Sequence, residues 1–321
     1  MGGSLLHSDR RTFLGSVAAL ALAGCGGGGK GGRTRLVLGD QVHLLQARAE
    51  SAGALKDLPY DIEWANFVGA APLLEALNAG AVDTAPAGDL PVVLAAAAKA
   101  PLKIVAGTQF STRDIGIVVP KGSPVRRIAD LKGRRVIVSS ARGSISHYLL
   151  IEALKEARVD RKAVEIGFML PNDAAAAFAA GRIDVWATFG TYQIAAELAG
   201  ARLIRDGEGI NSPYALIAAS QAALDDPGKR AALRDVMGRL QKAAIWSAKH
   251  PDAYADILVR QTKVARAVAD VMARRQRGVL VAPDAAVIVP LQRVVDRFYA
   301  DGELPARIDV ASIVDPGIFP A

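Results

Sequence analysis

The stretch FVGAAPLLEALNAGAVD, from Phe67 to Asp83, recurs in outline as FMLPNDAAAAFAAGRID, from Phe168 to Asp184, 101 residues further along the chain. In each copy a helical run ends at a glycine, and a β-branched residue and an aspartate then lead into a strand. Glycine after a helix adopts the left-handed conformation that other residues resist. The repeat therefore predicts two equivalent α/β lobes. One continuous sheet that carries two similar units is the alternative.

Around this repeat, strand-like and helix-like segments alternate, which predicts parallel sheets with helices on their faces. The segment from Pro227 to the C-terminus is mostly helical and is expected to pack against the first lobe. The expected strands are 34–39, 61–67, 82–85, 102–106, 116–119, 136–139, 164–169, 185–188 and 201–205, and the expected helices of the two repeats are 44–52, 72–78, 90–98, 145–157 and 174–180.

The repeat also indicates where a ligand would lie. Ligands of open α/β sheets collect at the carboxyl ends of the strands. Gly88-Asp89 and Phe189-Gly190 follow equivalent strands, so we expect them to face each other across a cleft. The chain would cross between the lobes near 113–116 and 207–214, where Gly, Asp, Asn and Ser are frequent, as a hinge requires.

The N-terminus has the pattern of an export signal. Arg10-Arg11 precede an apolar run, Phe13–Ala23, which is too short to span a bilayer, because a spanning helix needs about 20 residues. The arginine pair resembles a twin-arginine signal, and Leu22–Cys25 resembles a bacterial lipobox. We expect a signal peptide at 1–24, a lipidated Cys25 and a glycine-rich tether over 25–33, which predicts a membrane-anchored lipoprotein in the periplasm or at the cell surface.

Composition excludes several classes. Hydrophobic residues make up 51% of the 321 residues, which excludes disorder. The net charge of +7 comes from scattered basic pairs without interleaved aromatics, so no nucleic-acid partner is expected. This charge fits attraction of small anions, although an arginine-rich composition would produce it as well. The four histidines have no metal-ligand spacing, and no metal or cofactor is expected.

Further motifs bring a family into view. In order and spacing they resemble the aliphatic sulfonate-, taurine- and nitrate-binding proteins of ABC importers from about residue 34 onward. The motifs are Glu63-Trp64, Leu74–Asp83, Gly88–Pro91, Asp130–Gly133, Val136–Val138 with Arg142–Ser144 and His147–Leu150, Leu170-Pro171, Asp184–Ala187, Tyr192, Phe298–Gly302, Pro305 and Ile308–Val310.

The resemblance implies an α/β periplasmic-binding-protein type II fold, with two lobes, mixed sheets and a ligand cleft between them. It implies lobe 1 over 34–114, lobe 2 over 115–211 and a return to lobe 1 over 212–321. It also implies a monomer that delivers a small organic anion to a membrane permease, which a separate ATPase powers.

Candidate ligand contacts are hydrogen-bond donors near strand ends and helix starts, because such positions suit an anion. The serines of this set are equally suited to cap a helix. Asp89 would repel a sulfonate, so it is expected either to cap the helix at Leu90 or to receive an amine of the ligand. The candidates are Gln41, Gly88, Asp89, Ser111, Ser140, Arg142, Gly143, Ser144, Ser146, Thr188 and Phe189.

One departure from the family bears on the ligand. The family has tryptophan, aspartate and proline before the tyrosine, whereas this chain has Phe189 and Gly190 before Tyr192. Loss of the aspartate argues against an amino-sulfonate such as taurine, and the smaller residues leave space for a bulkier ligand.

Two other classes compete with a binding protein. Desulfinases and a thiamine-pyrimidine synthase share the implied fold, but they depend on cysteine, and the only cysteine here is Cys25. Since no catalytic triad is evident either, we expect that the chain is not an enzyme. A transcription regulator would need a DNA-binding module in place of 1–33. Binding of nitrate, bicarbonate or an aromatic acid remains an alternative to sulfonate.

Overall fold

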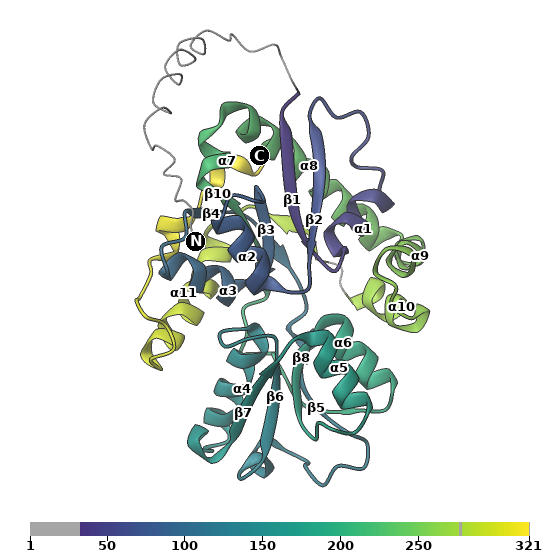
Figure 1. The fold of residues 1–321 in the computed structure, drawn as a ribbon, viewed down its shortest axis with the longest axis vertical. Coiled ribbons are helices and arrows are strands. Elements are labelled where there is room, and N and C mark those ends of the chain that lie inside the picture. The colour runs from purple at the N-terminus through teal and green to yellow at the C-terminus, as the bar shows by residue number, and fades with distance from the viewer. Residues whose placement is uncertain (1–32, 276–277, 321) are drawn as a thin grey trace, which may run out of the picture. The chain divides into compact units, whose positions relative to one another are not determined.

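The fold was described from a computed structural model that covers residues 33–275 and 278–320. Residues Thr34–Ala321 form one compact unit, whose sheets and helices are shown in Figure 1. The predicted signal peptide and Cys25 lie outside the described residues, as does the tether except for its last residue. Within the described ranges, every helix is too short or too polar to traverse a lipid bilayer.

The first sheet has six strands in the order β11-β4-β10-β3-β1-β2. β1 runs parallel to β2 and β3, whereas β10 is antiparallel to β3 and β4, and β11 is antiparallel to β4. The sheet is therefore mixed. Its strands are β1 (Arg35–Gln41), β2 (Asp61–Phe67), β3 (Thr84–Gly88), β4 (Leu102–Gln109), β10 (Tyr214–Ser220) and β11 (Leu280–Val281).

The second sheet has five strands in the order β7-β6-β8-β5-β9. β6 is parallel to β7 and β8, and β5 is antiparallel to β8 and β9. Two separate mixed sheets confirm the predicted fold class and exclude one continuous sheet. The strands are β5 (Ile115–Val119), β6 (Arg135–Ser139), β7 (Glu165–Met169), β8 (Trp186–Phe189) and β9 (Arg202–Asp206).

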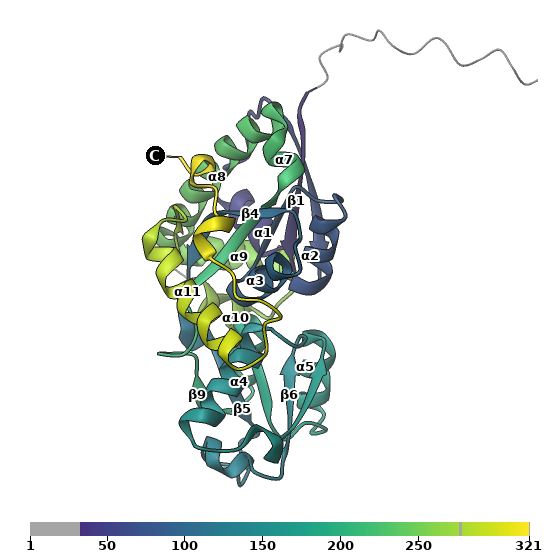
Figure 2. The same cartoon turned by 90° about the vertical axis from the view of Figure 1, so that its left-hand side faces the viewer.

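Eleven α-helices within the described residues cover the two sheets (Figures 1 and 2). We call the first sheet with α1–α3 and α7–α11 the first lobe, and the second sheet with α4–α6 the second lobe. The helices are α1 (Leu44–Ser51), α2 (Ala70–Asn78), α3 (Asp89–Ala97), α4 (Ile145–Glu156), α5 (Pro171–Ala179), α6 (Gly190–Leu198), α7 (Gln221–Asp225), α8 (Pro227–Lys249), α9 (Pro251–Thr262), α10 (Arg266–Arg275) and α11 (Ala285–Ala300).

The internal repeat is visible in the structure. α2 and α5 occupy equivalent residues of the two copies, and each follows the outer strand of its sheet, β2 or β7. Gly80 and Gly181, which follow these helices, both have positive φ, at 72° and 69°. Both glycines thus have the left-handed conformation that the sequence predicts.

The C-terminal segment contacts both lobes, not the first lobe alone as the sequence suggested. α8 packs on α1 and β1, and α11 packs on α3, as Figures 1 and 2 both show for α11. α10, however, contacts α6 of the second lobe. Ile194 of α6 shares a buried cluster with Tyr254 and Met272. This apolar contact joins the lobes beside the two chain crossings.

Candidate functional site

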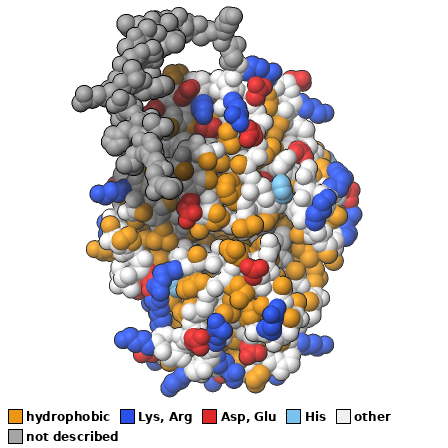
Figure 3. Space-filling model, in the orientation of Figure 1, with side chains coloured by type: hydrophobic (Ala, Val, Ile, Leu, Met, Phe, Trp, Pro, Cys, Tyr) orange, Lys and Arg blue, Asp and Glu red, His pale blue; other side chains and the backbone are white. Residues whose placement is uncertain are grey.

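A cavity of about 410 Å³ lies between the two lobes. It is bordered by the carboxyl ends of β1, β3, β6 and β8, which is where open α/β sheets bind ligands. In the view of Figure 3, hydrophobic side chains form much of the surface at the level where the lobes meet. The first lobe lines the cavity with Gln41, Ala70, Ala71, Leu74, Glu75, Asn78, Gly88, Pro91, Leu94, Ala95, Ala98 and Ala100, and the second with Ser140, Ala141, Arg142, Gly143, Ser144, Ile145 and Phe189.

Four helices begin at this cavity, two from each lobe. Ala70 opens α2, Gly88 is the N-cap of α3, Ser144 is the N-cap of α4 and Phe189 is the N-cap of α6, and all four residues line the cavity. The N-caps of α2, α3 and α6 make no side-chain capping bond. The positive ends of these helix dipoles therefore meet in one space, which favours an anion.

The three serines that follow β6 have two different roles. The Ser144 hydroxyl donates to Ser139 O at 2.8 Å and accepts from His147 N at 3.2 Å, so it caps α4. The Ser146 hydroxyl also donates to Ser139 O. The Ser140 hydroxyl lies at the start of α2, because a Cβ built on Gly69 would lie 3.3 Å from Ser140 Oγ. Of the three serines, Ser140 is the one placed to meet a ligand.

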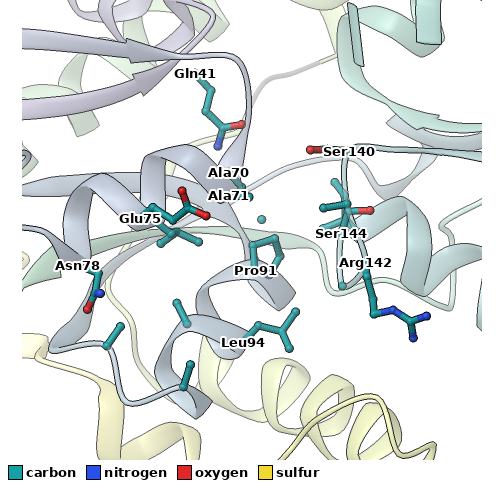
Figure 4. A pocket seen from close by; sticks show the side chains of 18 of the residues that line it. Gln41, Ala70, Ala71, Glu75, Asn78, Pro91, Leu94, Ser140, Arg142 and Ser144 are labelled. Atoms are coloured by element: carbon teal, nitrogen blue, oxygen red, sulfur yellow. The ribbon is translucent and has the colours of Figure 1, made fainter. Parts of the chain in front are cut away.

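Gln41 also faces the cavity, as Figure 4 shows. Its side-chain nitrogen donates one hydrogen bond to Pro86 O at 2.7 Å. An amide nitrogen carries two hydrogens, so one remains for a ligand. The bond to Pro86 fixes the amide beside the cavity.

Arg142 lines the cavity, but its guanidinium points away from Gln41 and Ser140 (Figure 4). It pairs with Glu303, which follows α11 in the first lobe, at 3.1 Å. Glu303 also accepts from Arg161, and its side chain is only 6% exposed, whereas that of Arg142 is 65% exposed. In this structure Arg142 therefore joins the lobes through Glu303, with its guanidinium directed away from Gln41 and Ser140.

Four predicted contacts are absent from the residues that line the cavity, namely Asp89, Ser111, Ser146 and Thr188. Asp89 and Thr188 are buried, and Ser111 precedes the crossing to β5. Asp89 Oδ1 accepts from Leu90 N at 2.7 Å, and its Oδ2 has no hydrogen-bond partner among the described residues. Burial raises the pKa of Asp89 to about 7, against the opposing effect of the Leu90 N–H. Asp89 thus lies inside the protein, near the cavity but not in it.

The lobes touch where two glycines permit it. A Cβ on Gly88 of the first lobe would lie 2.6 Å from Ile145 Cγ2 of the second. A Cβ on Gly143 of the second lobe would lie 2.0 Å from Leu94 Cδ1 of the first, and Gly143 has φ of 78°. Both distances are shorter than any van der Waals contact, so glycine at these positions lets the lobes close around the cavity.

His147, on α4, is buried and packs edge-on against Phe168 and Phe298. Its Nδ1 accepts from Gly143 N at 3.1 Å. Burial lowers the pKa of His147 to about 4, so the ring is neutral at pH 7. The ring positions the loop that follows β6 and does not face the cavity.

Sequence reasoning missed the far part of the cavity, which lies between α2 and α3. Leu74, Glu75, Asn78, Leu94 and Ala95 line it. In the sequence their spacing looks like the ordinary core face of two helices. Glu75 was the available signal, because it puts a charge among apolar residues of α2.

Two α/β lobes that offer strand ends and helix N-termini to a cavity between them define the solute-binding protein fold. The sequence pattern of the NMT1/THI5-like family matches residues 62–254, more than half of the chain, and the chain belongs to this family.

Relatives whose names refer to sulfonate binding are similar in sequence or in fold. A protein of Escherichia coli strain K12, named as an aliphatic sulfonates-binding protein, is 30% identical over 78% of this chain and 77% of its own length. The alkanesulfonate-binding protein SsuA from Xanthomonas axonopodis pv. citri, bound to MOPS, is 30% identical with a TM-score of 0.81, over 88% of this chain and 98% of that one. The periplasmic SsuA of Escherichia coli is 27% identical with a TM-score of 0.77, over 89% and 93%.

A crystal structure of the desulfurization enzyme DSZB is also similar, with 18% identity and a TM-score of 0.65 over 89% of this chain and 97% of that one. At this identity the likeness concerns the fold alone.

Proposed function

We propose that this chain is the extracytoplasmic solute-binding component of an ABC importer and that it captures an organic sulfonate between its lobes. The observation that carries this proposal is the convergence of four helix N-termini, two from each lobe, on one cavity. The sulfonate-binding relatives support the choice of anion.

The cavity favours an organic sulfonate over nitrate or bicarbonate. Its volume of about 410 Å³ far exceeds that of nitrate or bicarbonate, and most of its first-lobe lining is apolar. Such a lining matches the carbon part of a ligand whose charged end lies at the helix N-termini.

An enzyme of the desulfinase kind is the second candidate, and the likeness to DSZB is the observation that raises it. The chain carries one cysteine, Cys25, whereas the cavity is lined by residues between Gln41 and Phe189. No thiolate is therefore available in the cavity as a nucleophile. The chemistry of the lining fits binding and release.

The remaining parts of the proposal concern place and partners. We infer a monomer with lobes over 34–114 and 212–321 and over 115–211, held to the membrane by a lipid on Cys25. Its partners are a membrane permease and the ATPase that drives it. An anchored receptor stays close to its permease, so the lipid anchor and the permease partner support each other.

A ligand panel tests the function. The purified folded part is expected to gain about 5 °C in Tm when a bound sulfonate is present at about 100 times its Kd. Nitrate, bicarbonate, sulfate and benzoate at equal concentration are expected to produce no shift. Absence of stabilisation by every sulfonate from one to ten carbons would refute the proposal.

Ser140→Ala sharpens this test, because it removes a donor that faces the cavity. We expect sulfonate Kd by calorimetry to rise about three- to tenfold, as for a hydrogen bond to a charged group. Ser111→Ala is the matched control, since Ser111 does not line the cavity. Its Kd should equal that of the wild type.

A further inference from the structure

The cavity continues as a groove between α2 and α3. On each helix the lining residues are spaced i, i+3, i+4 and i+7, so they form one stripe along two helical turns. At 1.5 Å per residue each stripe is about 10 Å long. The α2 stripe is Ala71, Leu74, Glu75 and Asn78, and the α3 stripe is Pro91, Leu94, Ala95 and Ala98.

The groove extends from the helix N-termini between mainly apolar walls, in which Glu75 and Asn78 of α2 are the polar side chains. Both helices begin at the anion site and end away from it, so residues later in each helix lie deeper along the groove. Leu74, Pro91, Leu94 and Ala95 make its walls apolar. A ligand whose sulfonate lies at the helix N-termini would extend its carbon body along this groove, well beyond the length of a two-carbon sulfonate.

Glu75 is the charged side chain of this groove. It is exposed, and no hydrogen bond or ion pair of its carboxylate occurs within residues 33–275 and 278–320. Figure 4 shows the carboxylate directed towards the space below Gln41 rather than into the helix bundle. Glu75 lies one helical turn beyond Ala71, which is at the anion end. An unpaired carboxylate beside an anion site repels a purely anionic ligand and attracts a cation.

We propose that the ligand is a zwitterionic sulfonate with an extended apolar body, whose ammonium group lies beside Glu75 in the groove between α2 and α3. This inference rests on the proposed function and adds the substrate class. Glu75 is then a specificity-determining residue. In this proposal Glu75 takes the role of two other acids: the family aspartate, whose loss at Gly190 argued against an amino-sulfonate, and Asp89, which is buried outside the cavity.

Two matched ligands test the charge. Cyclohexylamino-propanesulfonate carries an ammonium at pH 7, and cyclohexyl-butanesulfonate has a methylene in its place. We expect the wild type to bind the ammonium ligand about fivefold more tightly, as for a partly solvated ion pair. Glu75→Gln should abolish this difference and leave the affinity for the methylene ligand unchanged or higher. Asp57→Asn, an exposed acid outside the cavity, is the charge-matched control and should retain the preference.

A steric variant tests the groove itself. Ala95→Leu fills the groove without changing charge or helix propensity appreciably. Binding of both cyclohexyl ligands should fall at least tenfold, while methanesulfonate affinity should stay as in the wild type. Retained affinity for the cyclohexyl ligands in Ala95→Leu, or an equal preference in wild type and Glu75→Gln, would overturn the inference. In either case methanesulfonate binding would still support the sulfonate function, and loss of all sulfonate binding by the wild type would refute that function as well.

Discussion

Asp89 and Glu75 show how differently two nearby acids behave in this protein. Asp89 is 3% exposed at the junction of β3 and α3, with one oxygen bonded to Leu90 N and the other unpaired. Glu75 is exposed in the groove. A buried carboxyl without full hydrogen bonding favours its neutral form. The state of Asp89 therefore bears on stability, and that of Glu75 on the ligand choice proposed above.

The buried Asp89 predicts that stability depends on pH. Its folded pKa of about 7 lies above the unfolded value of 3.8, so the folded state holds the proton more tightly. The contribution of Asp89 to stability is then complete below pH 3.8 and is lost as pH rises through 7. From pH 6 to 8 this loss is about 1 kcal/mol. Thermal unfolding across this range should show it.

Asp89→Asn isolates this effect, because an amide keeps the shape and does not titrate. The variant should lose less stability than the wild type between pH 6 and 8. Burial also raises the pKa of Asp40, to about 6. Asp40 therefore lowers stability with rising pH as well, but mainly below this range. An equal loss of stability between pH 6 and 8 in the wild type and in Asp89→Asn would contradict the assignment of this loss to Asp89.

At the residue scale the sequence could predict positions better than orientations. Gln41 and Phe189 end strands and Ser140 follows one, and that placement brought them to the cavity. Asp89 follows a strand too, yet its side chain turns inward. The identity of Arg142 indicated an anion contact, but its partner Glu303 is 161 residues away and only the fold brings them together.

At the element scale, the segment after α11 connects the lobes through charge. Glu303 accepts from Arg142 and Arg161, and the positive charge of Arg142 lowers the pKa of Arg161, after the larger effect of burial. Lys155 of the second lobe similarly pairs with Asp301. Glu303 thus offsets repulsion between two arginines, and it does so only when the lobes are together.

We expect Glu303→Gln to weaken ligand binding about three- to tenfold, because it removes an attraction present only in the closed arrangement. Calorimetry gives the affinity, and small-angle scattering of the ligand-saturated protein should show a larger radius of gyration than for the wild type.

Asp256→Asn is the control for this prediction. Asp256 also pairs with an arginine, Arg266, but both side chains are more than half exposed and lie in the first lobe. Such a pair contributes little, so affinity and scattering should match the wild type. Unchanged affinity in Glu303→Gln would show that the pairs with Arg142 and Arg161 do not stabilise closure.

Elements were predictable where local pattern and fold agree. The helix, glycine and aspartate of the repeat located α2 and α5. β10 was missed, because Tyr214–Ser220 is rich in alanine and has little β propensity of its own. It becomes a strand by pairing between β3 and β4, which are far away in the sequence. The mixed character of the sheet depends on that insertion.

At the scale of the whole molecule, Cys25 predicts membrane attachment. Cells given labelled palmitate should incorporate the label into the wild-type protein and not into Cys25→Ala. Since the chain has no other cysteine, no second thiol can take the label. Cys25→Ala should no longer associate with the membrane. Its Kd for sulfonate should equal that of the wild type, because the described cavity lies within residues 41–189. Label in Cys25→Ala would contradict lipidation at this residue.

The close approach at Gly88 and Gly143 has a kinetic consequence. With Ile145 and Leu94 packed against these glycines, the lobes contact each other at two points beside the cavity, and we expect a bound ligand to leave mainly when the lobes separate. Residence time is then governed by the frequency of a domain motion, which falls in the microsecond to millisecond range, and not only by the strength of the ligand's own contacts. A partner that pulls the lobes apart could discharge the cargo without competing for any of its hydrogen bonds.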